Sequence, residues 1–108
     1  MPLTRSFKET VKARAERDAD FRDALFTEGV DAMLAGNMDA GKASMRDYIN
    51  ATIGFEKLGG LTRKPPKSLM RMLGPRGNPQ ARNLFEVIGH LQKAEGLRFR
   101  LSLRKSAR

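Results

Sequence analysis

The residues with the most distinctive chemistry in this sequence are two cations and a hydroxyl in its second half. Lys67, Ser68 and Arg71 lie close together, and Lys67 and Arg71 are four residues apart. In a helix, that spacing places two side chains on the same face. An arginine can donate two hydrogen bonds to guanine in the major groove of DNA, and lysine or serine can bind a base edge or a phosphate. These three residues are therefore candidates for reading DNA bases.

Further cations flank this segment and are candidates for binding phosphates. Neutralising phosphates releases condensed counterions, so the affinity for DNA should fall steeply as salt is added. Each of these cations can equally be a solvated surface charge, and the sequence leaves both interpretations open. The flanking cations are Arg63, Lys64, Arg76 and Arg82.

The charge of the chain is unevenly distributed. Residues 1–53 contain 8 Lys and Arg against 9 Asp and Glu, whereas residues 54–108 contain 13 against 3. The second half therefore accounts for the net charge of +9. Such an asymmetry favours one polyanion-binding face over a uniformly basic surface.

The sequence offers no set of residues suited to catalysis. It contains no cysteine, which excludes disulfides and thiolate metal sites, and His90 is its one histidine. No pair of acidic residues is accompanied by a candidate nucleophile or by further metal ligands. We therefore expect neither enzymatic activity nor a metal or other cofactor. His90 is expected to be a helix-surface or interface residue.

Length and composition predict one folded domain in a reducing compartment. A chain of 108 residues with 40% hydrophobic content suffices for a single core. No apolar run approaches the ~18 residues of a membrane span, so no membrane association is expected. The N-terminal residues Met1–Arg5 are not followed by an apolar segment, which argues against a secretory signal. We therefore expect a cytoplasmic protein.

Helices are predicted throughout residues 1–53, where apolar residues recur at helical spacing. The first helix carries Leu3, Phe7 and Val11 at every fourth position. Phe7 and Val11 form a narrow apolar stripe and are candidate contacts with a protein partner; burial within the chain's own core is the alternative. The expected boundaries are Thr4 for the first helix, Asp18 or Asp20 and Gly36–Asn37 for the second, and Asp39 for the third.

Residues 54–96 predict two short helices joined by a turn, followed by a longer helix. Thr62–Lys64 forms the turn, and Pro65–Pro66 begins the second short helix because proline suits the first helical turn. Gly59 and Gly60 weaken the preceding helix by roughly 1 kcal/mol each relative to alanine. The Gly74–Pro79 segment cannot continue a helix. The residues expected to be buried are Phe55, Leu58 and Leu61 in the first helix, Leu69, Met72 and Leu73 in the second, and Leu84, Val87, Ile88 and Leu91 in the third, which ends near Gly96.

Residues 97–104 alternate between apolar and polar, which is typical of a β-strand. A single strand in a helical chain has no partner, and its backbone groups would remain unpaired. We therefore predict that this strand pairs with its counterpart in a second copy; the alternative is a frayed basic tail. The apolar positions of the expected dimer strand are Leu97, Phe99, Leu101 and Leu103.

Several residues in one register resemble the DNA-binding unit of Xre-type, phage-repressor-like helix-turn-helix proteins. Leu58 matches the buried leucine of the scaffold helix, and Ser68–Arg71 match the recognition-helix segment. Asn78–Pro79 match the Asn-Pro before the next helix, and Leu84 matches the leucine that follows it. The resemblance implies that the helix beginning at Pro65–Pro66 enters the major groove.

From about Asp20 onward the chain is similar to HigA-like addiction-module antidotes (antitoxins), also described as prophage DNA-binding proteins. The residues that carry this similarity are in Ala35–Asp39, Leu69–Leu73 and Gly77–Leu84. The resemblance implies a homodimeric repressor that binds the operator of its own operon and neutralises a RelE/HigB-like toxin, a ribonuclease, by forming a complex. Such a protein is nucleoid-associated when bound to DNA.

This chain departs from the family pattern at three positions around the turn. Arg63 stands where the family often has glycine, and Pro65 where it often has a small N-capping residue. Gly59 stands where the family usually has alanine. The base contacts of the family are therefore not transferred to this chain.

The sequence thus predicts an all-α helix-turn-helix bundle of about five to six helices with a C-terminal strand paired across a dimer. Residues 1–53 would pack on the DNA-binding region formed by 54–96, and 97–108 would supply the strand and a basic tail, in one folding domain. A stand-alone prophage-type regulator without a toxin and an RNA-binding basic protein are the alternatives. The RNA alternative fits less well, because Tyr48 and the six Phe mostly occupy apolar helical positions and are not available to stack on bases.

Overall fold

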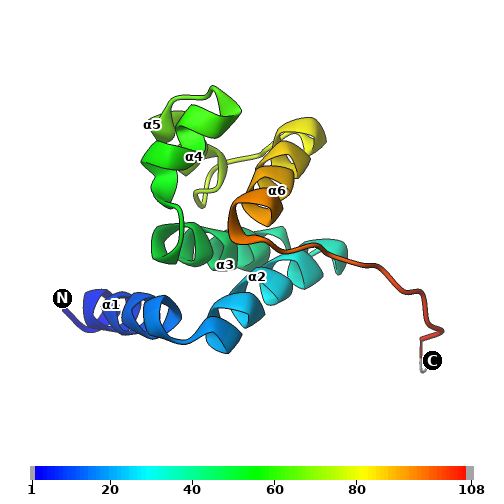
Figure 1. The fold of residues 1–108 in the computed structure, drawn as a ribbon, viewed down its shortest axis with the longest axis horizontal. Helices are drawn as coiled ribbons and strands as arrows, with labels where there is room; N and C mark the ends of the chain where they lie inside the picture. Colours follow the sequence, from blue (N-terminus) through cyan, green and yellow to red (C-terminus); the bar gives the residue numbers. More distant parts are fainter. Residues whose placement is uncertain (1, 107–108) are drawn as a thin grey trace.

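The structure is a computed structural model that describes residues 2–106, and their side chains from residue 10 onward. Within this range the chain is all-helical, as predicted (Figure 1). The helices are α1 (Pro2–Arg17), α2 (Ala19–Leu34), α3 (Met38–Ala51), α4 (Gly54–Thr62), α5 (Pro66–Met72) and α6 (Ala81–Glu95).

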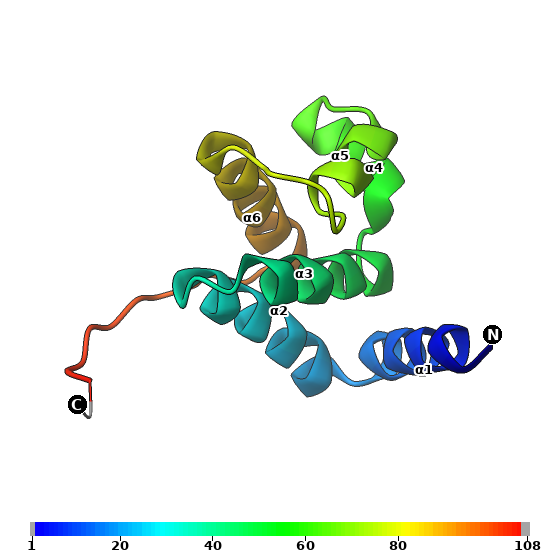
Figure 2. The same cartoon turned by 180° about the vertical axis from the view of Figure 1, so that it is seen from behind.

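Helix α3 lies between two groups of helices (Figures 1 and 2). On one side α1 and α2 pack against it, and on the other side α4 connects it to α5 and α6. Helix α5 and the N-terminal end of α6 form the end of the molecule that is opposite α1. The segments predicted to contact DNA are therefore well separated from the first helix.

Two glycines allow α2 and α3 to pack closely. Gly29 and Gly41 are both buried where these helices cross. A Cβ atom added to Gly41 would lie 2.8 Å from the carbonyl oxygen of Gly29 and 2.5 Å from Cγ of Met33. Because close-packed interiors have no room for such contacts, any side chain at Gly41 would force the two helices apart.

Polar side chains fix the starts of α2 and α3. The backbone N–H of Phe21 donates to the Asp18 carboxylate at 3.1 Å, which confirms Asp18 as the cap of α2. Helix α3 begins slightly before the expected boundary, with Asn37 as its cap, because the Asn37 side-chain oxygen accepts from the N–H of Ala40 at 3.4 Å. Asp39 lies in the first turn instead, where a carboxylate interacts favourably with the helix dipole.

An aromatic stack joins α2, α3 and the segment after α6. The rings of Phe26 and Tyr48 stack with centroids 4.4 Å apart, and Phe99 packs edge-on against Phe26 at 4.7 Å. The predicted inward positions of α6 are all buried around this stack. The buried core comprises Phe26, Met45, Tyr48, Ile49, Phe55, Leu58, Leu69, Leu73, Leu84, Val87, Ile88 and Leu91.

Helix α1 begins earlier than the sequence suggested, at Pro2 and not at Thr4. The side chain of Phe7, a predicted partner contact, lies outside the described side chains. Val11, the other predicted contact, is partly buried, and Ala15 is fully buried. Because α1 contacts both α2 and α3, only part of the Val11 side chain is available to a second protein.

Capping interactions determine the path of the chain after α6. Gly96 has a left-handed backbone conformation (φ 66°), and the N–H of Leu97 donates to the Gln92 carbonyl at 2.8 Å. This is the usual way in which a glycine ends a helix. The N–H of Phe99 then donates to the side-chain oxygen of Gln92 at 2.7 Å. These bonds direct the tail back across the core.

The predicted C-terminal strand does not form within residues 97–106. Leu97 and Phe99 pack against the chain's own core, so the expectation that they face a second copy in a dimer strand was wrong. The physical reason is that the end of α6 and the aromatic stack already provide partners for this part of the tail. Leu101 and Leu103, in contrast, are 83% and 102% exposed.

The hydroxyl of Tyr48, the only tyrosine, is buried without a hydrogen-bond partner among the described residues. Burial raises the pKa of Tyr48 well above its usual value of 10.0, and the charges of Glu95 and Asp23 raise it further. The folded state therefore keeps this phenol neutral at a pH at which the unfolded chain would ionise it.

Replacing Tyr48 with Phe should leave the free energy of unfolding near pH 7 unchanged or raise it by about 1 kcal/mol, because a desolvated hydroxyl is removed and the ring is kept. Above about pH 10 the unfolded phenol ionises first, so the native protein should lose stability that Tyr48→Phe retains. Urea unfolding from neutral to alkaline pH measures both effects. A loss of more than about 1 kcal/mol at pH 7 would show instead that the hydroxyl makes a stabilising hydrogen bond.

Candidate nucleic-acid interface

A tight turn connects α4 to α5 and sets the direction of α5. Arg63, which ends α4, has a left-handed backbone conformation (φ 59°). The N–H of Lys64 donates to the Gly59 carbonyl at 3.1 Å. A Cβ atom added to Gly59 would lie 2.7 Å from the Lys64 carbonyl oxygen and 3.2 Å from Cγ of Pro66. The turn therefore requires glycine at position 59.

The geometry of this turn shows the structural effect of two departures from the helix-turn-helix pattern. A left-handed conformation costs roughly 1–2 kcal/mol for a residue with a side chain, so glycine would suit position 63 better than arginine does. Pro65 forms no side-chain cap, but Pro66 occupies the first turn of α5 and has no N–H that needs one.

Helix α5 has one buried and one exposed side. Leu69 and Leu73 are fully buried, as predicted. Met72 is only partly buried, and Leu61 of α4 is 45% exposed, so these two expected core residues lie at the edge of the core. The exposed side chains of α5 are those of Lys67, Ser68, Met70 and Arg71.

A concave surface lies between α5 and the N-terminal end of α6, with the loop of residues 73–80 at its base. Its cationic side chains are those of Lys64, Arg71 and Arg76, and Ser68 adds a hydroxyl. Cations beside neutral hydrogen-bonding groups are suited to bind a polymer that is both anionic and rich in donors and acceptors. The side-chain amides that line the same surface are those of Asn78, Gln80 and Asn83.

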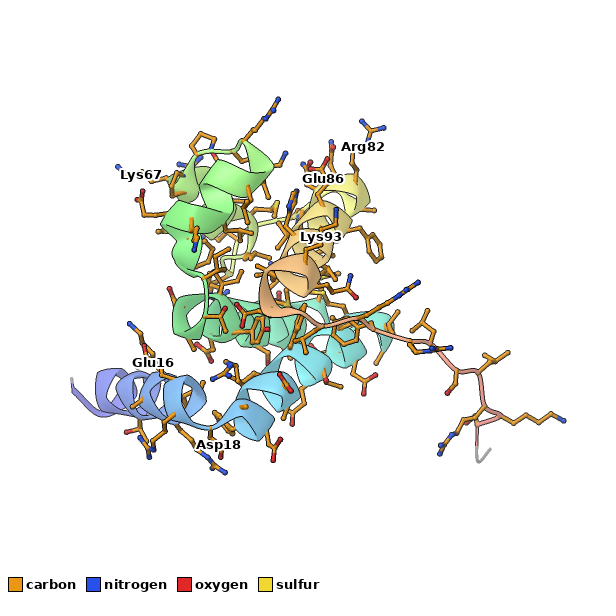
Figure 3. All side chains as sticks on the ribbon, viewed as in Figure 1. Glu16, Asp18, Lys67, Arg82, Glu86 and Lys93 are labelled. Atoms are coloured by element: carbon orange, nitrogen blue, oxygen red, sulfur yellow. The ribbon has the colours of Figure 1, made fainter. Side chains whose placement is uncertain are left out.

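The structure brings together some of the predicted DNA-contacting residues and separates others. Lys64, Ser68, Arg71 and Arg76 line the concave surface; Arg63, Lys67 and Arg82 do not. In Figure 3, Lys67 lies on the side of α5 that faces away from α6, and Arg82 lies at the N-terminal end of α6. Arg63 is exposed in the turn. These last three residues therefore lie outside the concave surface.

An ion pair links the turn to α6. The Lys64 Nζ atom lies 3.3 Å from a Glu86 carboxylate oxygen, and both side chains are partly exposed. Partly exposed ion pairs contribute little to stability, so the Lys64 ammonium can exchange this carboxylate for a phosphate at small cost. Phosphate binding by Lys64 stays a prediction.

Two cations of α3 hold the loop that forms the base of the concave surface. Lys42 is 2% exposed; its Nζ atom donates to the Gly77 carbonyl at 2.6 Å and lies 3.7 Å from Asp39 Oδ1. The guanidinium of Arg46 donates to the Leu73 carbonyl, at the end of α5. A buried ammonium is unfavourable unless it is hydrogen-bonded, so these contacts fix the loop at the position where its carbonyls satisfy the cations.

The sequence did not predict that Lys42 and Arg46 anchor the loop, and it did not single out the side-chain amides of the concave surface as candidate contacts. Nothing in the sequence distinguishes Lys42 or Arg46 from solvated cations, because their partners are carbonyls 27 to 35 residues away. The amides of Asn78, Gln80 and Asn83 were visible only as parts of a family motif. The signal that could have singled them out is the concentration of polar side chains in the first turn after Pro79.

The comparisons with known proteins do not assign a family to this chain: no protein-family model, no curated protein and no solved structure matches it. The side chains described from residue 10 to 106 include no group of three His, Asp or Glu that could hold a metal ion, and His90 is partly buried in α6. None of the helices described here is long and apolar enough to span a bilayer.

Gly59→Ala should lower the free energy of unfolding by about 1–3 kcal/mol, because the added methyl group overlaps the Lys64 carbonyl and forces α4 and α5 apart. Gly60→Ala is the matched control in the same helix. A Cβ atom at Gly60 has nothing within 4 Å, so this variant should gain up to about 1 kcal/mol from helix propensity. Urea unfolding of both variants provides the measurement, and equal effects at the two positions would contradict the tight turn.

Arg63→Gly should raise the free energy of unfolding by up to about 1 kcal/mol, because the relief of left-handed strain exceeds the entropy that glycine adds to the unfolded chain. Arg63→Ala removes the same charge and keeps the Cβ atom, so it should give no such gain. Thermal unfolding of the two variants separates the backbone effect from the charge effect. A stabilisation that is the same for alanine and glycine would show that the arginine charge, and not its φ angle, is unfavourable.

Proposed function

We propose that this chain binds duplex DNA through α5 and the adjoining concave surface, and that it acts as a sequence-specific transcriptional repressor. The observation that supports the proposal is that one side of α5 is buried in the core while the other side is exposed. Leu69 and Leu73 fix its back in the core, while Ser68 and Arg71 face a surface that also presents Arg76. A recognition helix needs this combination of an immobilised back and a polar, cationic front.

The dimensions of α5 suit the major groove. An α-helix with its side chains is about 10–12 Å in diameter, and the groove is about 12 Å wide. The helix lies at one end of the molecule, with α1 at the opposite end (Figures 1 and 2). A duplex can therefore approach α5 without meeting the helices that form the other side of the fold.

The side chains of the concave surface have distinct roles in this proposal. Arg71 donates a pair of hydrogen bonds to a guanine, and Ser68 binds a neighbouring base or phosphate. Gln80 and Asn83 carry the amide groups that recognise adenine, which adds two base-reading candidates to those predicted from the sequence. Arg76 binds a phosphate. Lys64 in the concave surface, and Arg63, Lys67 and Arg82 outside it, add phosphate contacts that position the duplex.

The resemblance to HigA-like antidotes supports a narrower version of the proposal. In that version the duplex is the operator of the chain's own operon, and the chain is an antitoxin that neutralises a RelE/HigB-like toxin. Residues 1–53 would then supply the protein-binding surface, because α1 and α2 lie on the side of α3 opposite α5. A small toxin-like reading frame beside the gene, whose product stops growth unless this chain is co-expressed, would distinguish the antitoxin from a stand-alone regulator.

The first experiment is a binding assay with a labelled duplex from the region upstream of the gene, a random duplex of equal length and a duplex RNA, at two salt concentrations. Selective binding of the upstream duplex that weakens steeply with salt is expected. Equal and weak binding of both DNA duplexes would contradict sequence-specific recognition. Preference for the RNA would favour an RNA-binding protein instead.

Arg71→Ala should weaken binding to the upstream duplex by about 10- to 100-fold, with a smaller effect on the random duplex, because a bidentate base contact is worth about 1–3 kcal/mol. Arg17→Ala is the matched control: it removes the same charge from an exposed position at the end of α1. It should change the affinity by less than about twofold at moderate salt. Full affinity and selectivity in Arg71→Ala would rule out α5 as the recognition helix.

A further inference from the structure

An apolar groove lies between the C-terminal end of α2 and the first half of α6, and it adjoins the concave surface at Pro79. Val30 and Leu84 contribute to its floor, and Met38 begins the next helix beside it. Two large apolar side chains on its walls are highly exposed to solvent: Leu34 is 63% exposed and Phe85 is 64% exposed. Contiguous exposed apolar surface of this kind is a candidate interaction site.

The tail of the chain presents the complementary feature. Phe99 is held on α2 by the Phe26 ring and by its hydrogen bond to Gln92, and the chain then extends away from the helices (Figures 1 and 2). The next two apolar residues, Leu101 and Leu103, are almost completely exposed. The molecule therefore carries an open apolar groove and an unburied apolar segment at the same end.

The spacing of the two leucines fits the groove. In an extended segment, residues two apart project to the same side about 7 Å from each other. Val30 and Leu34 on α2 are one helical turn apart, about 6 Å along the helix axis. The two leucine side chains could thus occupy successive positions along the α2 wall of the groove.

The charges of the two surfaces are also complementary. Residues 97–106 contain Arg98, Arg100, Arg104 and Lys105 and no acidic residue. Two of the four acidic residues of α2, Glu28 and Asp31, lie in the C-terminal half of the helix that includes Val30 and Leu34. The single cation of α2, Arg22, donates to the Ala15 carbonyl near the other end. A cationic, leucine-bearing segment is therefore attracted to the α2 wall of the groove.

We propose that residues 100–105 of a second copy occupy the groove, and that the two copies exchange tails to form a dimer. Leu101 and Leu103 of each copy would be buried by the α2 and α6 walls of the other, and no β-strand pairing is needed. Leu97 and Phe99 remain in their own core and fix the point from which each tail leaves. The proposal does not depend on DNA binding, because neither the groove nor the tail includes Ser68 or Arg71.

The test is the molar mass of the full chain in solution without DNA, measured by sedimentation velocity from micromolar to near-millimolar concentration. The native chain should be a dimer. The tail variant Leu101→Asp/Leu103→Asp and the groove variant Leu34→Asp/Phe85→Asp should each dissociate, with a dimer dissociation constant raised by at least about tenfold. Leu61→Asp, which alters an exposed leucine outside the groove, is the control and should remain a dimer.

A mixture of the tail variant and the groove variant distinguishes exchange from other contacts. The mixed dimer keeps one intact tail and one intact groove that face each other, so native mass spectrometry should detect it under conditions in which neither variant pairs with itself. Circular dichroism confirms that each variant is folded, as expected for substitutions at exposed positions. A monomeric native chain, a dimer that survives either double substitution, or the absence of the mixed dimer would overturn the proposal. Arg71→Ala should remain dimeric even if the protein does not bind DNA.

Discussion

The close contact between Gly59 and the carbonyl of Lys64 is the constraint on which the proposed interface depends. Because position 59 has no side chain, α4 can turn directly into α5, and the two prolines then begin α5 without needing capping bonds. This direction of α5 puts Leu69 and Leu73 into the core and leaves Ser68 and Arg71 outside. A methyl group at position 59 would displace α5 from α4. The buried side of α5 would then no longer fit the core, and its exposed polar side chains would be misplaced. The left-handed Arg63 shows that the chain accepts local strain to keep this turn.

Helix α3 couples the two sides of the molecule. Its N-terminal half packs against α2 through glycines, and its cations Lys42 and Arg46 reach the loop that follows α5. A buried ammonium would be costly on its own, and the Gly77 carbonyl offsets that cost only when the loop is in place. The position of Arg76, which lies in this loop, therefore depends on a helix that does not itself line the proposed DNA surface.

The sequence was sufficient where local chemistry determines structure. Apolar periodicity located every helix, the Pro and Gly segments located the turns, and the inward positions of α6 were all correct. It failed where the outcome depends on contacts between distant residues. The burial of Lys42 requires a carbonyl 35 residues away. The tail alternates like a strand, but its first half is held by Gln92 and Phe26, and no pattern within residues 97–104 reveals those partners. The amides of the concave surface belong to a loop and a helix end whose position relative to α5 only the fold determines.

The central claim is that α5 and the concave surface beside it contact duplex DNA. The most direct test is to follow the backbone amide resonances of the isotopically labelled chain by NMR during titration with the upstream duplex. If α5 binds the duplex, the largest shifts should cluster on residues 63–83, with Ser68, Arg71 and Asn83 among them, and α1 should be unaffected. Shifts confined to α1 or to the basic tail, with α5 unchanged, would contradict it and would place the nucleic acid on another part of the molecule.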